Sequence, residues 1–486
     1  MVFPSIVFLF LFLPLSLLIV FADYVWGSGR GGSVKRVVGI NVALFGLSLL
    51  FYFWGESERI WILLSSIGVS YGCVRFLQRG PGDVEIGAVS RRCVLVLGVV
   101  SNLGLLGWFK YYGFFSESLV GIFGDLDWGT AEIALPLGIS FFVFQSLSSV
   151  VDAYRHPADE APSLLRFATY ISFFPQLVAG PIVRYSEIKD YLAVRCYGRE
   201  NFVLGAKRFI GGLAKKVLIA NQVALLADTI FAQPAEQLGL FDAWLGCAAY
   251  AIQVLYDFSG YSDMAIGLGL MFGIRLPENF NRPYAARSIG AFWRRWHMTL
   301  SRWFRDYLYI PLGGNRHGGF RTALNLFIVF ALCGFWHGAS WNFLLWGLLH
   351  GAFLSLERLA GRDRIERLGG FGFGVLGRFY VLGVVCVSWA LFRAETVEQA
   401  WSFMVAMSGM SGVDVVHSYS LIGLSWDVLA AFAVGAAMAL FRWKKPRALE
   451  GTAGELVSYG IYLVLFLMCI SFVAADTYNP FIYFRF

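Results

Sequence analysis

Apolar stretches of about 17–25 residues, long enough for a helix to cross the hydrocarbon core of a membrane, recur from Val2 to Phe484. No polar block between them is long enough to fold separately. We therefore predict one all-α, polytopic membrane domain over residues 1–486. About 11–12 spans are expected, from apolar runs near residues 3–22, 37–54, 60–78, 93–115, 132–151, 217–232, 243–272, 323–340, 341–356, 374–393, 424–441 and 456–474.

Composition supports a membrane protein. The chain is 58% hydrophobic and only 15% charged, whereas about a quarter of the residues in soluble proteins are charged. The net charge of +7 comes from Lys and Arg in connecting segments, which points to membrane orientation and not to nucleic-acid binding. The seven cysteines are scattered without a CxxC pair, so neither a disulfide framework nor a metal site is expected.

Two features refine the predicted topology. The apolar segment 164–184 is interrupted by Pro175, Gly180 and Pro181, which predicts a re-entrant segment whose exposed backbone groups are covered by protein. Basic loops, such as the one carrying Lys215 and Lys216, alternate with acidic ones. This alternation satisfies the positive-inside rule, with both termini outside, if 164–184 does not cross.

The basic and aromatic segment 281–322 is predicted to lie at the cytoplasmic interface or below the spans. At about 100° per residue, one helix face would gather apolar side chains and the opposite face arginines. The apolar face comprises Ile289, Trp293, Trp296, Leu300, Trp303, Phe304 and Tyr307, and the basic face Arg294, Arg295, Arg302 and Arg305. His297 falls on the aromatic side and can point inward, although an anchoring helix with an incidental histidine fits the same pattern.

His337 lies within the apolar stretch ALCGFWHGASWNFLLWGLLHG (331–351). Placing a polar group in hydrocarbon costs roughly 2–4 kcal/mol, so an ionisable residue there is a candidate functional residue. A buried neutral imidazole can act as a general base on a hydroxyl, although a purely structural hydrogen bond remains an alternative. His350 would lie about 140° away on a straight helix, so the two rings share a site only if the helix breaks at Gly338–Trp341.

Asp257 and Asp263 lie in or at the end of another apolar run. Buried carboxylates need partners, and the arginines of residues 275–321 are candidates. A structural role is favoured, with substrate positioning as the alternative. No histidine or cysteine spacing suits a metal, and no GxSxG, Walker or GxGxxG pattern is present.

Several motifs, in this order, resemble the membrane-bound O-acyltransferase family, most nearly its bacterial polysaccharide branch. They are LPLGISFFVFQSLSSVVDAYR (135–155), FFPQLVAGPIVR (173–184), GGLAKKVLIAN (211–221), YDFSGYSDMAIGLG (256–269), ENFNRPY (278–284), FWRRWHMTLSRWFRDYLYIPLGGNR (292–316) and CGFWHGASWNFLLWGLLHG (333–351). The resemblance is motif by motif over residues 100–360. It implies a multi-helix fold around a transmembrane tunnel, with His337 as the catalytic histidine and His297 as the second characteristic residue.

The resemblance also implies a reaction. An acetyl donor, acetyl-CoA, would enter from the cytoplasm, where Arg294, Arg295 and Arg302 could meet its phosphates, and no resident cofactor or metal is expected. The acetyl group would cross the bacterial inner membrane, surrounded by lipid, to a separate periplasmic acetyltransferase partner. The final acceptor would be an exopolysaccharide, with alginate first and peptidoglycan or cellulose as alternatives.

A hypothesis from another class is a transporter or flippase for a lipid-linked intermediate. Such proteins usually contain internal repeats, and none is visible in this sequence.

Overall fold

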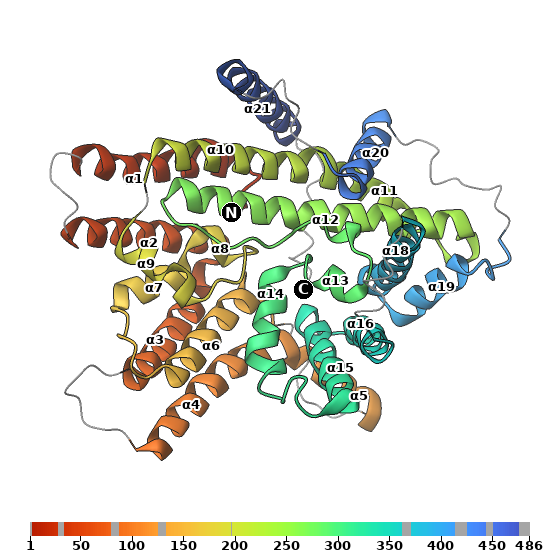
Figure 1. Cartoon of the computed structure of the whole chain (residues 1–486), viewed down its shortest axis with the longest axis horizontal. Helices are drawn as coiled ribbons and strands as arrows, with labels where there is room; N and C mark the ends of the chain where they lie inside the picture. Colours follow the sequence, from red (N-terminus) through yellow and green to blue (C-terminus); the bar gives the residue numbers. More distant parts are fainter. Residues whose placement is uncertain are drawn as a thin grey trace. The chain divides into compact units, whose positions relative to one another are not determined.

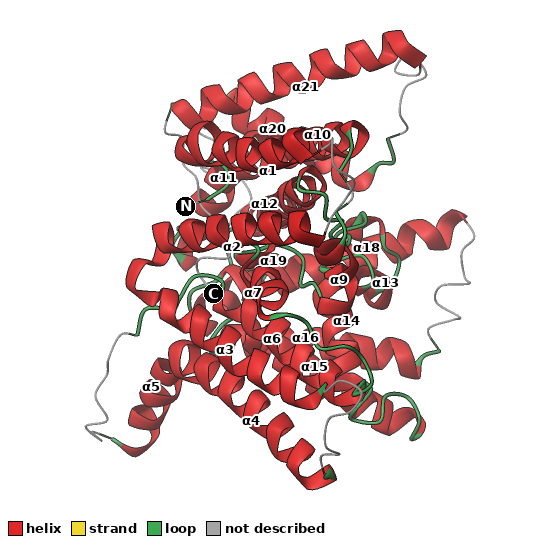
Figure 2. Ribbon diagram, turned by 90° about the vertical axis from the view of Figure 1, so that its left-hand side faces the viewer, coloured by secondary structure: helices red, strands yellow, loops and turns green. Residues whose placement is uncertain are grey.

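The computed structural model describes residues 2–27, 34–78, 87–124, 133–195, 197–361, 371–413, 425–443 and 451–475. These residues form helices joined by loops, without a strand (Figure 1, Figure 2). Within them, six helical stretches are long and apolar enough to cross a membrane. This result confirms the all-α polytopic class. The other predicted runs also form helices, and the number of crossings stays a prediction.

The chain divides into two compact units. Unit 1 comprises Met1–Phe209 and Met264–Pro277, and unit 2 comprises Ile210–Asp263 and Glu278–Phe486. The predicted single domain with a motif-rich region near 100–360 stays a prediction. Some loops used to predict orientation, including those with Arg79, Asp125 and Lys444, lie outside the described residues.

Unit 1 contains the N-terminal helices. They are η1 (Phe8–Phe12), α1 (Leu13–Gly27), α2 (Val34–Glu56), η2 (Ser57–Arg59), α3 (Ile60–Leu77), α4 (Ala88–Leu106), η3 (Gly107–Tyr111), α5 (Tyr112–Phe123), α6 (Ile139–Arg155), α7 (Leu164–Ser172), α8 (Phe174–Leu177) and α9 (Tyr185–Ala193). Helices α10 (Arg199–Ala214) and α12 (Leu240–Met271) contribute residues to both units.

Polar side chains join three of these helices, because α3, α4 and α6 pack against one another. The hydroxyl of Ser66 donates to Oδ1 of Asn102 (2.9 Å), and Nδ2 of Asn102 donates to the Ser70 hydroxyl (2.9 Å). Ser66 also lies 3.1 Å from the Ser146 hydroxyl. Hydrogen bonds between buried serine and asparagine side chains stabilise helix packing in apolar surroundings.

The segment 164–184 is broken and covered by protein, as predicted. Helix α7 ends at Ser172, α8 covers only Phe174–Leu177, and the next helix begins at Tyr185. The exposed backbone groups find side-chain partners: the Tyr170 hydroxyl donates to the carbonyl of Val183 (2.8 Å) and Gln176 Nε2 donates to the carbonyl of Tyr170 (2.6 Å). Whether the segment turns back without crossing stays a prediction.

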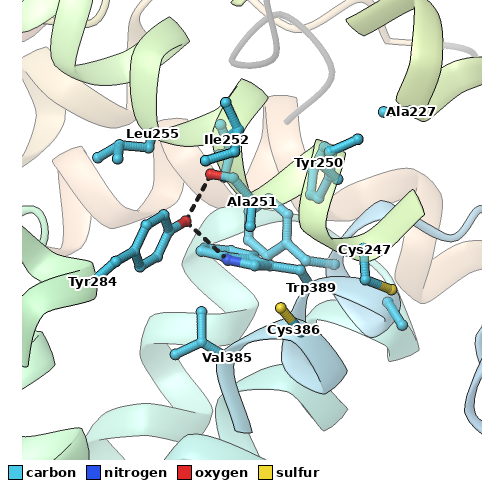
Figure 3. Packing of buried hydrophobic residues seen from close by; sticks show 14 of the residues in the cluster. Ala227, Cys247, Tyr250, Ala251, Ile252, Leu255, Tyr284, Val385, Cys386 and Trp389 are labelled. Atoms are coloured by element: carbon cyan, nitrogen blue, oxygen red, sulfur yellow. Dashed lines mark hydrogen bonds between the residues drawn. The ribbon is translucent and has the colours of Figure 1, made fainter. Parts of the chain in front are cut away.

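Unit 2 contains the remaining helices. They are η4 (Lys215–Ala220), α11 (Asn221–Phe231), η5 (Ala235–Gln237), η6 (Pro283–Ala285), α13 (Ile289–Trp293), α14 (Met298–Phe304), η7 (Arg305–Tyr309), α15 (Gly318–His337), α16 (Trp341–Leu359), α18 (Phe371–Arg393), α19 (Val397–Met407), α20 (Trp426–Leu440) and α21 (Gly451–Ala474). In its core the Trp389 indole donates to the Tyr284 hydroxyl (3.3 Å), which donates to the carbonyl of Ala251 (2.7 Å) (Figure 3).

One predicted helix is wrong in its continuity. Instead of a single amphipathic helix, the structure has the short helices α13 and α14, separated at residues 294–297. His297 adopts the left-handed conformation (φ 42°), which a continuous right-handed helix does not contain. The predicted apolar face still points into the protein despite the break, because Trp293, Trp296 and Leu300 are buried.

Candidate active site

Helices α15 and α16 form a tight hairpin that positions His337 (Figure 1). A Cβ atom on Gly334 would lie 2.2 Å from the carbonyl oxygen of Phe343, and one on Gly347 would lie 2.2 Å from that of Phe330. Only glycine permits this backbone approach. The hairpin turns at residues 338–340, so the helix break foreseen at Gly338–Trp341 is confirmed and leaves His337 at the end of α15.

The His337 ring lies among aromatic rings and is 3% exposed. Its centroid is 4.9 Å from Trp336, 5.1 Å from Trp346 and 5.4 Å from Phe392, with interplanar angles of 73°, 85° and 72°. These edge-to-face contacts fix the orientation of the ring. The His337 imidazole is thus enclosed by aromatic side chains and shielded from water.

His297 is fully buried and is held by Asn279. Oδ1 of Asn279 lies 3.1 Å from Nδ1 of His297 and accepts hydrogen bonds from the Thr299 backbone N–H (3.2 Å) and hydroxyl (2.9 Å). A backbone N–H can only donate, so the Asn279 atom that it contacts is the oxygen. Nδ1 of His297 must then carry the proton, which leaves a lone pair on Nε2.

Nε2 of His297 is buried without a hydrogen-bond partner among the described residues. Burial also lowers the pKa of His297 to about 3, because the charged form loses its hydration. The side chain therefore presents a neutral acceptor at physiological pH. Phe258 packs edge-on against the ring, with centroids 4.6 Å apart.

The two predicted histidines meet at one indole. The Trp336 ring centroid lies 4.9 Å from His337 and 6.3 Å from His297. Residues 40 positions apart in the sequence therefore flank the same aromatic side chain. The structure thus brings together the pair that the motifs singled out.

His350 contacts the same aromatic group. Its ring centroid is 4.9 Å from Trp346, which also contacts His337, and its Nδ1 accepts a hydrogen bond from the Trp293 indole (3.3 Å). His350 is buried and joins α16 to α13. Because His350 accepts the hydrogen bond of the Trp293 indole, we interpret it as a structural residue of the site.

Two residues that sequence analysis did not single out shape this region. Asn279, in the ENFNRPY string, fixes His297, and Glu357 fixes the start of α13. The Glu357 carboxylate accepts the backbone N–H groups of Ile289 (2.5 Å) and Gly290 (2.9 Å). The sequence contained a signal for Glu357, because a carboxylate near the end of an apolar run needs partners when it is buried.

The predicted arginines separate into two groups. Arg294 and Arg295 line a cavity of about 480 Å³, whereas Arg302 is not among its lining residues. The backbone links this cavity to His297, because Asn281 N–H donates to the carbonyl of Arg295 (2.9 Å) and Met298 N–H donates to that of Asn279 (2.9 Å).

Asp257 and Asp263 pair with lysines, whereas the sequence had pointed to arginines as candidate partners. Lys216 forms an ion pair with Asp257, in which both side chains are 1% exposed, and Lys215 Nζ lies 2.6 Å from Asp263 Oδ2. Lys215 and Lys216 come just after Gly212 in the sequence, where α10 packs closely against α12. A Cβ atom on Gly260 of α12 would lie 2.7 Å from the carbonyl oxygen of Gly212. The buried pairing is consistent with the structural role favoured for Asp257.

Buried imidazoles in a polytopic helical protein make this region a candidate enzyme site, and comparison with known sequences identifies the family. The membrane-bound O-acyltransferase family matches residues 6–363. This chain belongs to that family and is a multi-pass membrane O-acyltransferase.

Curated relatives narrow the chemistry. The chain is 37% identical to the probable alginate O-acetylase AlgI of Azotobacter vinelandii, over 100% of both chains. It is 43% identical to the protein of the same name from Pseudomonas aeruginosa, over 84% of this chain and 75% of the relative. It is also 37% identical to the peptidoglycan O-acetyltransferase of Helicobacter pylori, over 86% and 81% of the two chains. These names favour an enzyme over the transporter hypothesis.

Proposed function

We propose that this protein carries acetyl groups from a cytoplasmic donor across the bacterial inner membrane for O-acetylation of an exopolysaccharide, with alginate as the first candidate. The observation that carries the proposal is that His297 and His337 are both buried and both lie near the indole of Trp336. The relatives named alginate O-acetylase support the choice of polymer.

In the proposed reaction His337 is the general base. Its neutral ring takes the proton of an acceptor hydroxyl while the hydroxyl oxygen attacks the thioester carbonyl of the donor. The new C–O bond forms, the C–S bond breaks, and the departing sulfur takes up the proton from the imidazolium. The apolar rings of Trp346 and Phe392 keep water from competing with the hydroxyl.

His297 is proposed to position a reacting group. Its Nε2 lone pair can accept a hydrogen bond from a donor group of the bound substrates other than the reacting hydroxyl, while Asn279 holds the opposite nitrogen. Because burial favours the neutral ring, this acceptor stays available throughout the physiological pH range.

The proposed donor is acetyl-CoA, with Arg294 and Arg295 meeting its phosphates. Both line the cavity described above, and both belong to the segment that ends at His297. Arginine binds phosphate through two parallel hydrogen bonds. This arrangement supports a donor whose phosphates lie among the arginines while its thioester lies nearer the histidines.

A second candidate acceptor is peptidoglycan, which the similarity to the Helicobacter pylori peptidoglycan O-acetyltransferase favours. In either case we propose that a separate periplasmic acetyltransferase completes the modification. The protein purified alone should then transfer little acetate to polymer. Analysis of the acetylated polymer in cells that carry or lack this protein distinguishes alginate from peptidoglycan.

Replacement of the histidines tests the proposal. We expect His337→Ala to abolish O-acetylation with normal membrane insertion, and His297→Ala to cause a severe loss. His156→Ala, which removes an exposed histidine, should leave acetylation unchanged. Acetate released from the polymer by mild alkali measures each effect, and full acetylation in the His337→Ala strain would overturn the catalytic assignment.

A further inference from the structure

Six arginines line the cavity of about 480 Å³ in unit 2, and we name it the arginine cavity. No Asp or Glu is among its lining residues within the described chain. The arginines come from three separate stretches of sequence, and they are Arg282, Arg287, Arg294, Arg295, Arg378 and Arg442. Grouped guanidinium ions repel one another, so a fold that gathers them favours an anion between them.

Two backbone features place these arginines. Arg282 adopts the left-handed conformation (φ 49°), which is unfavourable for a residue with a side chain and is enriched at functional sites. Arg287 lies against α18 at two glycines. A Cβ atom on Gly374 would be 3.0 Å from Cζ of Arg287, and one on Gly377 would be 2.9 Å from its backbone oxygen. Larger residues at these positions would displace Arg287.

The cavity also has an apolar border. Leu440 and Phe441 belong to its lining, and Phe441 is 64% exposed. Phe379, which follows Arg378, is 68% exposed. The cavity thus adjoins the end of α20 and the first turns of the apolar stretch Gly374–Arg393. The ends of membrane-spanning helices lie at the level of lipid headgroups.

From this arrangement we infer that the arginine cavity is a binding site for a phosphate-bearing ligand. Guanidinium groups match phosphate oxygens in geometry and charge, and several arginines can bind a ligand that carries more than one phosphate or phosphodiester. The inference concerns binding alone; its lipid alternative is independent of the proposed function, whereas its donor alternative rests on it.

Two sources can supply this phosphate. One is the headgroup of an anionic phospholipid, whose acyl chains would cover the exposed Phe441 and Phe379. Basic pockets between helices bind such headgroups. The other is the phosphate portion of the proposed donor, which would contact Arg294 and Arg295. The apolar border favours the lipid, and the link to His297 favours the donor.

The test compares two triple variants of the full-length protein in detergent micelles. Arg287→Gln, Arg378→Gln and Arg442→Gln together alter the cavity and leave Arg294 and Arg295 in place. The matched control replaces three exposed arginines that do not line the cavity, and consists of Arg316→Gln, Arg321→Gln and Arg358→Gln. Both variants lose the same charge. Gel filtration and circular dichroism establish that each is folded.

Binding is measured in two arms. In the first, coenzyme A is titrated into the protein, with phosphate-free pantetheine for comparison. In the second, native mass spectrometry counts bound phosphatidylglycerol against phosphatidylcholine. We expect the cavity variant to bind at least one phosphate ligand about tenfold more weakly than the wild type, and the control to stay within about twofold.

A loss confined to phosphatidylglycerol identifies a lipid site, and a loss confined to coenzyme A identifies a donor site. If both ligands bind the cavity variant as they bind the control, the inference is overturned. If the triple variant does not fold, the single variants Arg378→Gln and Arg442→Gln replace it, with about threefold effects expected from each. The His337→Ala protein should bind phosphate ligands normally. Loss of the proposed reaction can therefore be distinguished from loss of binding at this site.

Discussion

Oδ1 of Asn279 lies 3.1 Å from Nδ1 of His297 and sets which nitrogen of that ring carries the proton. The same oxygen accepts two hydrogen bonds from Thr299, so its identity is fixed by the backbone. We expect Asn279→Ala to reduce acetyl transfer at least about tenfold and to destabilise the fold by about 1–3 kcal/mol, because buried donors lose their acceptor. Polymer acetate content and the thermal unfolding midpoint measure the two effects.

Asn279→Asp keeps an oxygen at this position and should retain more activity than Asn279→Ala. Thr299→Val removes one hydroxyl donor and leaves the contact with His297, so its effect should be smaller than either. Equal losses in all three variants would show that the region is sensitive to any change and that Asn279 does not position His297.

The pH dependence of stability should contain a contribution from His297. Its pKa in the folded protein is lowered to about 3, against about 6.5 in an unfolded chain. The unfolded state therefore binds the proton first, and stability present above about pH 6.5 is lost as the pH falls towards 3, by up to about 1.4 kcal/mol per pH unit.

His297→Phe removes this titration. Denaturant unfolding between pH 4 and pH 7 should accordingly show a shallower decline in stability for His297→Phe than for the wild type. Parallel curves for the two proteins would mean that the ring is already accessible to protons in the folded state.

The hairpin of α15 and α16 should not tolerate a side chain at its contact point. In Gly334→Ala the new methyl group would meet a backbone oxygen at 2.2 Å, so the helices must separate. We expect lower folded yield and a loss of acetylation. Gly460→Ala is the control, because a Cβ atom on that α21 glycine has no neighbour within 4 Å. An immunoblot of the membrane fraction measures the folded yield of both variants. Gly460→Ala should leave this yield unchanged or raise it slightly.

The Lys216–Asp257 pair offers a test of the role of Asp257. Lys216→Met alone leaves a buried carboxylate without its partner and should destabilise the protein by about 3–5 kcal/mol. The double variant Lys216→Met, Asp257→Leu should recover most of this stability, because two apolar groups replace the pair. Recovery of fold together with acetylation indicates a structural pair. Recovery of fold without acetylation would assign Asp257 to substrate positioning.

Much of this architecture could be predicted from the chain. Apolar runs predicted the helices, prolines predicted the break within 164–184, and the glycine at 338 indicated the turn after His337. These features are local, because helix formation and interruption depend on neighbouring residues.

The contacts between distant segments could not be predicted in this way. The placement of Asn279 beside His297 depends on the left-handed backbone at His297, which a helical periodicity does not foresee. The lysine partners of Asp257 and Asp263 lie more than 40 residues away, and the arginines near in sequence seemed equally suitable. The arginine cavity likewise combines Arg294 and Arg295, which the charge pattern assigned to one helix face, with arginines that are distant in the sequence, such as Arg378 and Arg442.

The turn at residues 338–340 fixes the angle at which α16 follows α15. One residue inserted inside the first turn of α16 would rotate the rest of that helix by about 100° and shift it by about 1.5 Å, which would carry the Trp346 indole away from the His337 ring. A hydropathy profile would barely register such an insertion. For chains of this design, the register of α16 against α15 thus decides whether Trp346 meets His337, even between two nearly identical sequences.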